Sequence, residues 1–437
     1  MLIRNATLAD GRVRDVRIED GRIDAVDEDL SEGEDGTEEN DIIDATGKRL
    51  LPGVIDAHVH VREPGFTHKE NWETISQSAA AGGVTTIVDQ PNTDPATIDA
   101  AGFDAKEECA TDSLVEYGIS GGVIPEWDPD SLFDRPLFVL GEVFLADSTG
   151  GMGIDDELFA DAAARAADEG AIVTVHAEDD TLFDEDALAA AGDGTGRDAD
   201  ADAWSAYRPA KAEVAAIELA CERASEAGAE LHIAHTTSPE AIDAAVEGGA
   251  TCEVCPHHLF LSRDDLDELG TYGMMNPPLR SEDRREGVFE RVADGRVDII
   301  ASDHAPHLPE EKEAPVSDAP SGVPGVETTL PLLLAAAENG KLTWERVQEL
   351  TATNPADIFD LPRKGAIEEG MDADLVLVDP DTVREIRGEE LHSKCGWTPY
   401  EGFDGIFPEL TVVRGEIVYD TRNDERFGEA VGSNVRR

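Results

Sequence analysis

The chain has 437 residues, enough for a large buried core, and its Asp and Glu residues outnumber its Lys and Arg residues by 96 to 35. The resulting net charge of −61 repels the phosphates of nucleic acids and the anionic face of membranes, which argues against polyanion-binding functions. Because 40% of the residues are hydrophobic and the acid is spread along the chain, a salt-adapted folded protein is favoured over an acidic disordered one.

No segment of the sequence indicates export or membrane insertion. The N-terminus lacks a basic and apolar signal, and no apolar run approaches membrane-spanning length, so we expect a cytoplasmic protein. Of the five cysteines, only Cys252 and Cys255 have the C-x-x-C spacing. Neither a second such pair nor a thioredoxin-like context accompanies them, and we interpret all five as reduced core thiols.

Short β-like runs separated by Gly and Asp turns fill the first fifty residues, and similar runs return near the end of the chain. Short strands of this kind suit a small β-sandwich better than a barrel. We therefore predict one β-sandwich domain built from residues 1–50 and 363–437. Residues 51–362 would be inserted between its two halves.

The central segment contains eight short apolar runs, most of which are followed by a helical pattern. Such repeats predict an α/β fold, specifically a (β/α)8 TIM-type barrel. The predicted strands are Val54–His58, Val84–Asp89, Val115–Gly121, Leu137–Phe144, Ile172–His176, Leu231–His235, Thr251–Cys255 and Val297–Ser302. The predicted helices include Glu70–Ala81, Asp156–Asp168, Ala210–Ala227, Pro239–Val246 and Glu282–Ala293. The stretch Asp193–Asp202 has no periodicity and is predicted to be an acidic surface loop.

Metal-competent side chains stand at the carboxyl ends of the predicted strands, where the active sites of barrels are built. Alternate residues of an extended segment share a face, so His58 and His60 can hold one ion together. His176, His235 and Asp303 end three later strands. One histidine alone is more often structural, but five placements at the same rim favour a metal site.

Two divalent ions would need an anionic bridge, which the end of the fourth predicted strand can supply. Glu142 and Asp147 are the candidates there. We favour Glu142 because it lies inside the strand, whereas Asp147 belongs to the following loop. The alternative for either residue is one more acid in an acidic protein.

The four candidate histidine ligands and Asp303 lie in blocks that resemble the dihydroorotase family of the amidohydrolase superfamily over nearly the whole chain. The blocks are Pro52–Gly65, Pro91–Thr93, Val175–Glu178, His232–His235, Pro256–Leu259, Asn276–Arg280, Ser302–His307 and Gly370–Val376. The resemblance implies one ion held by His58, His60 and Asp303. A second ion would be held by His176 and His235. Zinc is the default metal for such donors, although cobalt or manganese would fit similar geometry.

One departure from the family concerns the bridge. Related sequences commonly carry a carbamylated lysine at the position of Glu142, which keeps the negative charge on a shorter side chain. Either Glu142 bridges, or Asp147 does, or only one ion is held tightly. The number of ions therefore stays open at this point.

The resemblance implies reversible hydrolysis of (S)-dihydroorotate to N-carbamoyl-L-aspartate in pyrimidine biosynthesis. The nucleophile would be a metal-bound hydroxide, with Asp303 as general acid and base. The substrate carboxylate requires a planar double donor with an amide beside it, which Arg62 and Asn92 provide unless Arg62 forms a structural ion pair. Further substrate-binding residues implied by the family are His60, Asn276, His307, Ser321 and Gly322.

Three alternatives remain at the level of sequence. Allantoinase and dihydropyrimidinase are sister activities on the same scaffold, and a non-catalytic homologue would use it only for assembly. A homo-oligomer is expected by analogy with related barrels. Four histidines outside the metal set are expected to be structural or to support the ligands: His232, His257, His258 and His304. His68 and His392 carry no signal.

Overall fold

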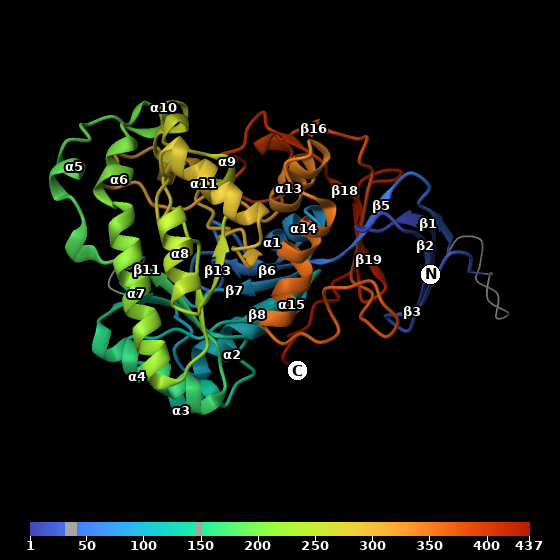
Figure 1. Ribbon diagram of the computed structural model, residues 1–437, viewed down its shortest axis with the longest axis horizontal. Coiled ribbons are helices and arrows are strands. Elements are labelled where there is room, and N and C mark those ends of the chain that lie inside the picture. The colour runs from blue at the N-terminus through green and yellow to red at the C-terminus, as the bar shows by residue number, and fades with distance from the viewer. Residues whose placement is uncertain (31–41, 146–150) are drawn as a thin grey trace.

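The computed structural model describes residues 1–30, 42–145 and 151–437 of the chain. Figure 1 shows two regions side by side, an α/β region and a sheet region. The sheet region contains the blue N-terminal and the red C-terminal strands, so both ends of the chain contribute to it.

The outer sheet joins nine strands of the described residues, five from the N-terminal segment and four from the C-terminal segment. β5 is the last N-terminal strand, and it pairs antiparallel with β15 so that Leu51 lies opposite Val376. Apolar side chains from both segments share one core beneath this sheet. The strands are β20 (Arg426–Phe427), β19 (Glu416–Asp420), β18 (Pro408–Val413), β15 (Leu375–Val378), β5 (Arg49–Pro52), β1 (Leu2–Thr7), β2 (Val13–Glu19) and β3 (Arg22–Asp27) in spatial order, with β4 (Ile42–Asp44) beside β1.

The α/β region is built on parallel strands that are almost completely buried. Burial on both faces explains why their sequences are rich in apolar residues and lack a regular alternation of apolar and polar positions. One sheet has the order β6 (Val54–Val59), β7 (Val84–Asp89) and β8 (Glu116–Ile119). The other has the order β10 (Gly153–Ile154), β9 (Leu140–Leu145), β11 (Val173–Ala177), β12 (Leu231–Ile233), β13 (Thr251–Val254) and β14 (Ile299–Ile300).

Two isolated parallel bridges connect these sheets at both of their edges. Gly121, just after β8, pairs with Leu140 of β9. His304, just after β14, pairs with Val59 of β6. The carboxyl ends of β6 and β14 therefore lie next to each other, although nearly 250 residues separate them in the sequence.

Helices surround the parallel strands, and their ends carry the expected caps. For α4, the side chain of Asp155 accepts a hydrogen bond from the Leu158 amide, and Gly170 ends the helix in the left-handed conformation. The helices are α1 (Trp72–Ala81), α2 (Ala100–Cys109), α3 (Pro129–Phe133), α4 (Asp156–Glu169), α5 (Glu185–Ala189), α6 (Asp202–Tyr207), α7 (Ala210–Ala227), α8 (Pro239–Glu247), α9 (Pro256–Phe260), α10 (Leu266–Leu269), α11 (Glu282–Ala293), α12 (Pro309–Lys312), α13 (Thr329–Glu338), α14 (Trp344–Gln348) and α15 (Asn354–Ile358).

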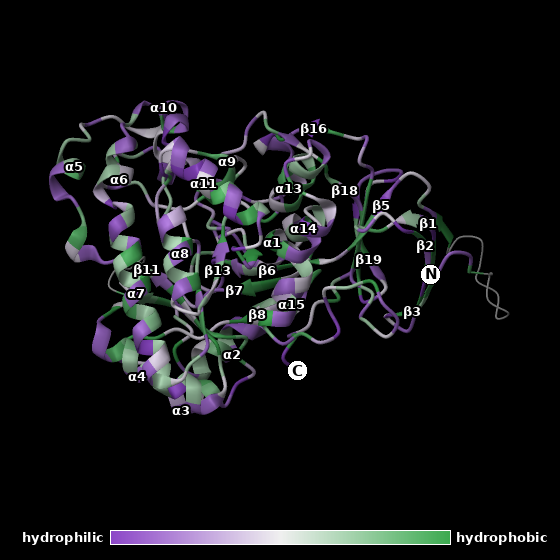
Figure 2. Ribbon diagram, viewed as in Figure 1, coloured by the Kyte–Doolittle hydropathy of each residue, from purple (hydrophilic) through white to green (hydrophobic). Residues whose placement is uncertain are grey.

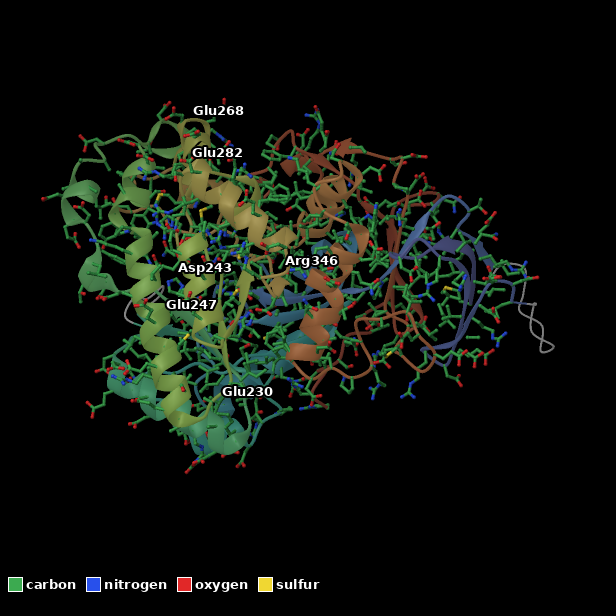
Figure 3. All side chains as sticks on the ribbon, viewed as in Figure 1. Glu230, Asp243, Glu247, Glu268, Glu282 and Arg346 are labelled. Atoms are coloured by element: carbon green, nitrogen blue, oxygen red, sulfur yellow. The ribbon has the colours of Figure 1, made fainter. Side chains whose placement is uncertain are left out.

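The outer faces of the helices are acidic. Figure 2 shows hydrophilic stripes along α7, α8 and α11, whereas the strands behind them are hydrophobic. Figure 3 labels acidic side chains over this face, including Asp243 and Glu247 of α8 and Glu282 of α11. Part of the acidic charge of the chain thus lies on solvated helix faces and outside the apolar core.

The long predicted helices are confirmed, and two of them, Ala210–Ala227 and Glu282–Ala293, match α7 and α11 residue for residue. The prediction of a surface loop at Asp193–Asp202 is wrong in part. Thr195 forms a bridge with Pro315, and Ala201 is only 1% exposed in a second apolar cluster. This segment has no helical periodicity because it packs through isolated small residues.

Candidate metal and substrate site

The five predicted metal ligands converge at the carboxyl ends of the parallel strands. His58 lies in β6 and His60 follows it, while His176 lies in β11. His235 and Asp303 follow β12 and β14 at the same edge. All five side chains are at least 90% buried, so the fold brings them together inside the protein and away from bulk water.

Glu142 of β9 lies between the two histidine pairs. Its Oε1 atom is 2.8 Å from Nε2 of His235 and 3.1 Å from Nδ1 of His176. Its Oε2 atom is 3.4 Å from Nε2 of His58 and 4.0 Å from Nε2 of His60. One carboxylate oxygen thus faces each pair, which is the arrangement that a bridging carboxylate requires.

Asp303 completes the first group of donors. Its Oδ1 atom is 3.0 Å from Nε2 of His60 and 3.6 Å from Nε2 of His58. The ligand atoms of these three residues lie within 4.8 Å of one another, as do those of His58, Glu142 and His235. These donor groups share His58, so two cation positions would be adjacent.

Two buried glutamates that the sequence predictions missed hold the histidine rings. Oε1 of Glu253 is 2.7 Å from Nδ1 of His58, and Oε2 of Glu178 is 3.0 Å from Nε2 of His176. A carboxylate on the far ring nitrogen orients a metal-binding histidine and raises its basicity. Glu253 had a signal in the sequence, because it is a lone charge inside an otherwise apolar strand.

Electrostatics favours ionised groups in this cluster. Burial alone would raise the pKa of Glu142, but the positive charge of His58 and the hydrogen bonds from His176 and His235 hold it well below its usual range. Burial would lower the pKa of His176, but Glu142 and Glu178 raise it to about 10. Without a metal, protons on the histidines therefore balance the carboxylates.

Three site residues have a backbone conformation that is costly for any residue except glycine. The φ angles are 66° at Arg62, 35° at His235 and 43° at Asp303. Left-handed φ values cost a non-glycine residue roughly 1 to 2 kcal/mol and cluster at functional sites, where surrounding structure holds them. The strained residues are therefore ones whose side chains must be held in a fixed direction toward the cavity.

The donors fit divalent cations. Nε2 of His58 and Nδ1 of His235 are buried and have no hydrogen-bond partner within the described part of the chain. Leaving a buried nitrogen atom unpaired is unfavourable, and a cation would satisfy Nε2 of His58, which lies 3.4 Å from Oε2 of Glu142. Imidazole and carboxylate ligands together suit zinc and related first-row ions.

A cavity opens next to these donors. Arg62 and Asn92 come from the ends of β6 and β7, and Oδ1 of Asn92 is 2.8 Å from Nδ1 of His60. His307 does not line the cavity but lies behind Arg62, with 3.4 Å between His307 Nε2 and Arg62 Nη2. The residues that line the cavity are His60, Arg62, Asn92, Glu142, Phe144, His176, His235, Asn276, Asp303, Ala305, Ser321 and Gly322.

The remaining residues that the sequence analysis singled out lie at different places in the structure. Asp147 lies outside the described residues. His232 contacts Glu253, and the nitrogen atom Nδ1 of His304 accepts from the Gly325 amide, so both support the site or the fold around it. All five cysteines are free thiols and four of them are buried. Within the described ranges, no helix is long and apolar enough to cross a membrane.

Comparison with known proteins agrees with this architecture. The family model described as "Amidohydrolase family" matches residues 49–418. The dihydroorotase of Halobacterium salinarum is 60% identical over 437 residues, covering 100% of both chains. An allantoinase of Salmonella newport is 33% identical, covering 96% of this chain and 95% of its own.

A solved structure shows the same fold. The L-hydantoinase (dihydropyrimidinase) of Arthrobacter aurescens superposes with a TM-score of 0.91 at 30% identity, covering 100% of this chain and 99% of its own. The matched segment spans the strands that carry the histidines, Glu142 and Asp303. The chain belongs to the amidohydrolase family.

Proposed function

We propose that the chain is a dihydroorotase, which hydrolyses (S)-dihydroorotate reversibly to N-carbamoyl-L-aspartate. The observation that carries this proposal is one cavity that combines buried metal donors with Arg62 and Asn92, the donors that a substrate carboxylate needs. The relative named dihydroorotase is 60% identical, whereas the allantoinase is 33% identical, which favours this substrate over allantoin.

The chain would hold two Zn²⁺ ions. His58, His60 and Asp303 would hold the first and His176 with His235 the second, with Glu142 between them as the bridge. The placement of one Glu142 oxygen toward each histidine pair supports this assignment. When bound, the ions would supply activation of water at neutral pH and polarisation of the ring carbonyl.

Asp303 would move the proton of the reaction. Burial would raise its pKa, but the hydrogen bond from His60 and the charges of His58 and His235 hold it below its usual range, so the carboxylate is ionised. The carboxylate of Asp303 would accept the proton of the attacking water and donate it to the departing ring nitrogen. In the direction of ring closure the same proton would travel the opposite way.

The remaining residues of the cavity would bind the substrate. Arg62 and Asn92, with His307 beside them, would hold the free carboxylate. Arg62 is buried without an ion pair among the described residues, which supports its role as a ligand-binding donor over a structural one. Asn276 would reach the ring, while Ser321 and Gly322 would contribute backbone groups, since all three line the cavity.

We also propose a closed (β/α)8 barrel with an attached β-sandwich. The bridges Gly121 to Leu140 and Val59 to His304 support closure around β6, β7, β8, β9, β11, β12, β13 and β14. The proposed domains are residues 1–50 with 363–437 for the sandwich and 51–362 for the barrel. The shared apolar core of the outer sheet supports this division. A homo-oligomer stays a prediction.

The test uses full-length protein purified in high salt. Bound metal per chain and dihydroorotate formation from carbamoyl aspartate would be measured for wild type, Glu142→Ala and Asp147→Ala, with allantoin and dihydrouracil as alternative substrates. The expected result is dihydroorotate turnover, with loss of metal and activity only in Glu142→Ala.

Other results would replace the proposal. Metal-replete protein that acts only on allantoin or dihydrouracil would make the chain a sister enzyme. Metal-free, inactive wild type would indicate a non-catalytic role. Loss of metal in Asp147→Ala but not in Glu142→Ala would move the bridge to Asp147.

A further inference from the structure

Asn276 lines the cavity, and its side-chain amide has one partner within the described residues, the indole of Trp204. Nε1 of Trp204 is 3.1 Å from the oxygen Oδ1 of Asn276. Trp204 belongs to the short helix α6, which lies between β11 and α7 in the sequence. The proposed function uses Asn276 but gives Trp204 no role.

The indole decides which way round the amide of Asn276 lies. An indole N–H can only donate a hydrogen bond, so the atom of Asn276 that faces it must be the oxygen. A rotation of the amide by half a turn would place its NH2 group against the indole N–H, donor against donor. The same N–H is also 3.3 Å from the carbonyl oxygen of Met275, a longer contact that shares its proton. The amide therefore keeps its oxygen toward Trp204.

This orientation leaves the NH2 group of Asn276 unused by the protein. Nδ2 of Asn276 has no hydrogen-bond partner among the residues that the structure describes. The side chain is only partly buried and forms part of the cavity wall. Because its oxygen is occupied by Trp204, Asn276 offers donors to a ligand in this cavity, and the ligand atom beside it must be an acceptor.

The backbone on both sides of Asn276 is fixed by other contacts. The carbonyl oxygen of Met274 accepts from the Gly322 amide at 2.9 Å. The carbonyl oxygen of Pro277 accepts from Nε2 of His258, also at 2.9 Å. What remains adjustable is the rotation of the asparagine side chain, and this is the feature that the indole controls.

Trp204 is itself held by neighbouring side chains. Its ring centroid is 5.4 Å from that of Tyr207, and the guanidinium of Arg208 lies over its ring at 5.5 Å. Arg208 also donates to Glu178, the carboxylate that contacts His176. The indole is therefore packed against groups that support the cavity from behind.

We infer that Trp204 is a positioning residue that directs the NH2 group of Asn276 to the ligand and thereby selects ring amides with a second carbonyl group. This inference rests on the proposed function. In dihydroorotate one ring carbonyl is attacked, and the carboxylate is assigned to Arg62 and Asn92. The acceptor left for Asn276 is the carbonyl between the two ring nitrogens. A ring amide without that carbonyl gains nothing from Trp204.

The test combines Trp204→Phe, which removes the N–H but keeps an aromatic ring, with Asn276→Ala, which removes the amide. In the zinc-loaded full chain, Trp204→Phe should raise KM for dihydroorotate by about threefold to about tenfold, the worth of one neutral hydrogen bond. The kcat should stay within about twofold. Asn276→Ala should raise KM at least as much, and the double variant should raise it no further, because both changes remove the same contact.

A second probe isolates the carbonyl group. A piperidinone carboxylate keeps the reacting amide and the carboxylate of dihydroorotate but has CH2 groups in place of the second carbonyl and its neighbouring nitrogen. Its inhibition constant should be the same for wild type and Trp204→Phe. The matched control is Trp127→Phe, which should change neither constant. Trp127 does not line the cavity, and its indole donates to none of the described residues.

The indole signal reads the contact without turnover. In ¹⁵N–¹H spectra, the indole of Trp204 is assigned through its absence in Trp204→Phe. Asn276→Ala should move this signal, because the nearer acceptor of the N–H is lost. Trp127→Phe should leave it in place.

Four results would overturn the inference. They are an unchanged KM in Trp204→Phe, a rise of KM that adds to that of Asn276→Ala, an equal weakening of the piperidinone carboxylate, and an indole signal that Asn276→Ala does not move. If wild type converts dihydrouracil but not dihydroorotate, the proposed function fails, and the same comparison is made between dihydrouracil and unsubstituted piperidinone. If it converts neither, the selection of a ring carbonyl fails with the proposed function, while the indole signal still decides whether Trp204 holds Asn276.

Discussion

Two buried charged clusters of this molecule differ in whether they are complete. Lys364 donates to both Glu116 and Asp374, and all three side chains are at most 7% exposed. In the cavity, by contrast, His58 and His235 each keep a buried nitrogen without a partner in the described structure. Buried charges are tolerated when each has an ion-pair partner, as in the Lys364 cluster. We therefore interpret the Lys364 cluster as structural.

The cavity cluster would be completed by a bound cation. The ligand atoms of His58, Glu142 and His235 lie within 4.8 Å of one another, as do those of His58, His60 and Asp303. Convergence of imidazole and carboxylate donors beside a cavity, more than buried charge as such, therefore distinguishes the candidate site from the Lys364 cluster.

The largest expected effect comes from a substitution in the cavity cluster. Glu142→Gln keeps the shape of the side chain but removes the charge that faces both histidine pairs. We expect kcat/KM to fall by on the order of a thousandfold, about 4 kcal/mol of transition-state stabilisation. Metal content and steady-state kinetics would measure this.

Glu116→Gln is the matched control for this change, since Glu116 is also a buried carboxylate but belongs to the Lys364 cluster. It should lose stability and keep its metal. Full metal content and activity in Glu142→Gln would contradict the proposed bridge.

The second effect comes from a substitution in the cluster of Lys364, Glu116 and Asp374. Lys364→Met leaves Glu116 and Asp374 buried without their common cation. Removing one partner of a buried ion pair costs about 3 to 5 kcal/mol. Urea unfolding at constant high salt should show this loss, and metal content in the native baseline should stay unchanged. A loss below about 1 kcal/mol would show that the cluster is not structural.

The third effect comes from a buried lysine whose hydrogen bonds, within the described residues, go to carbonyl oxygens. Lys312 donates to the carbonyl oxygens of Met274, Pro320 and Gly322, and burial lowers its pKa from 10.5 to about 7. Between these pH values the unfolded chain binds the extra proton, so stability rises with pH across that window. The stability of wild type relative to Lys312→Met should rise by about 2 kcal/mol from pH 7 to pH 9.

Denaturant unfolding of both proteins at these two pH values measures the difference, which cancels groups common to both. A difference that falls as the pH rises would show that Lys312 is stabilised in its charged form by the carbonyl oxygens.

The smallest effect comes from an exposed pair. Arg135 binds Asp104 with two contacts of 2.6 and 2.7 Å, but the side chains are 31% and 53% exposed. Solvent and salt screen such a pair, so Arg135→Ala should leave the free energy of unfolding unchanged within the error of the measurement. A loss as large as that of Lys364→Met would remove the distinction between exposed and buried pairs.

The sequence predicted the long helices and the buried strands well, because their apolar patterns extend over whole elements. It did not predict short helices such as α9, α12 and α14, which are too short for a helical period to appear. The segment around Ala201 was misjudged for a related reason, since single buried alanines in an acidic stretch carry no pattern.

The candidate ligands could be found because they follow strands, and the structure brings them to one cavity. Their supporting groups were harder to find. Glu178 is one of 96 acids, and Glu253 is marked in the sequence only as a lone charge inside a short strand. Their contacts with His176 and His58 appear only in the fold.

The outer sheet also constrains how the protein is made. Leu51 of β5 is synthesised before its partner Val376. At a translation rate of roughly 5 to 20 residues per second, Val376 follows roughly 15 to 65 seconds later. During this time the first strands present an unpaired edge and an uncovered apolar face, the features that promote aggregation of nascent chains. The last strands synthesised therefore close the molecule, and a truncated translation product would leave the N-terminal strands as a target for chaperones and proteases.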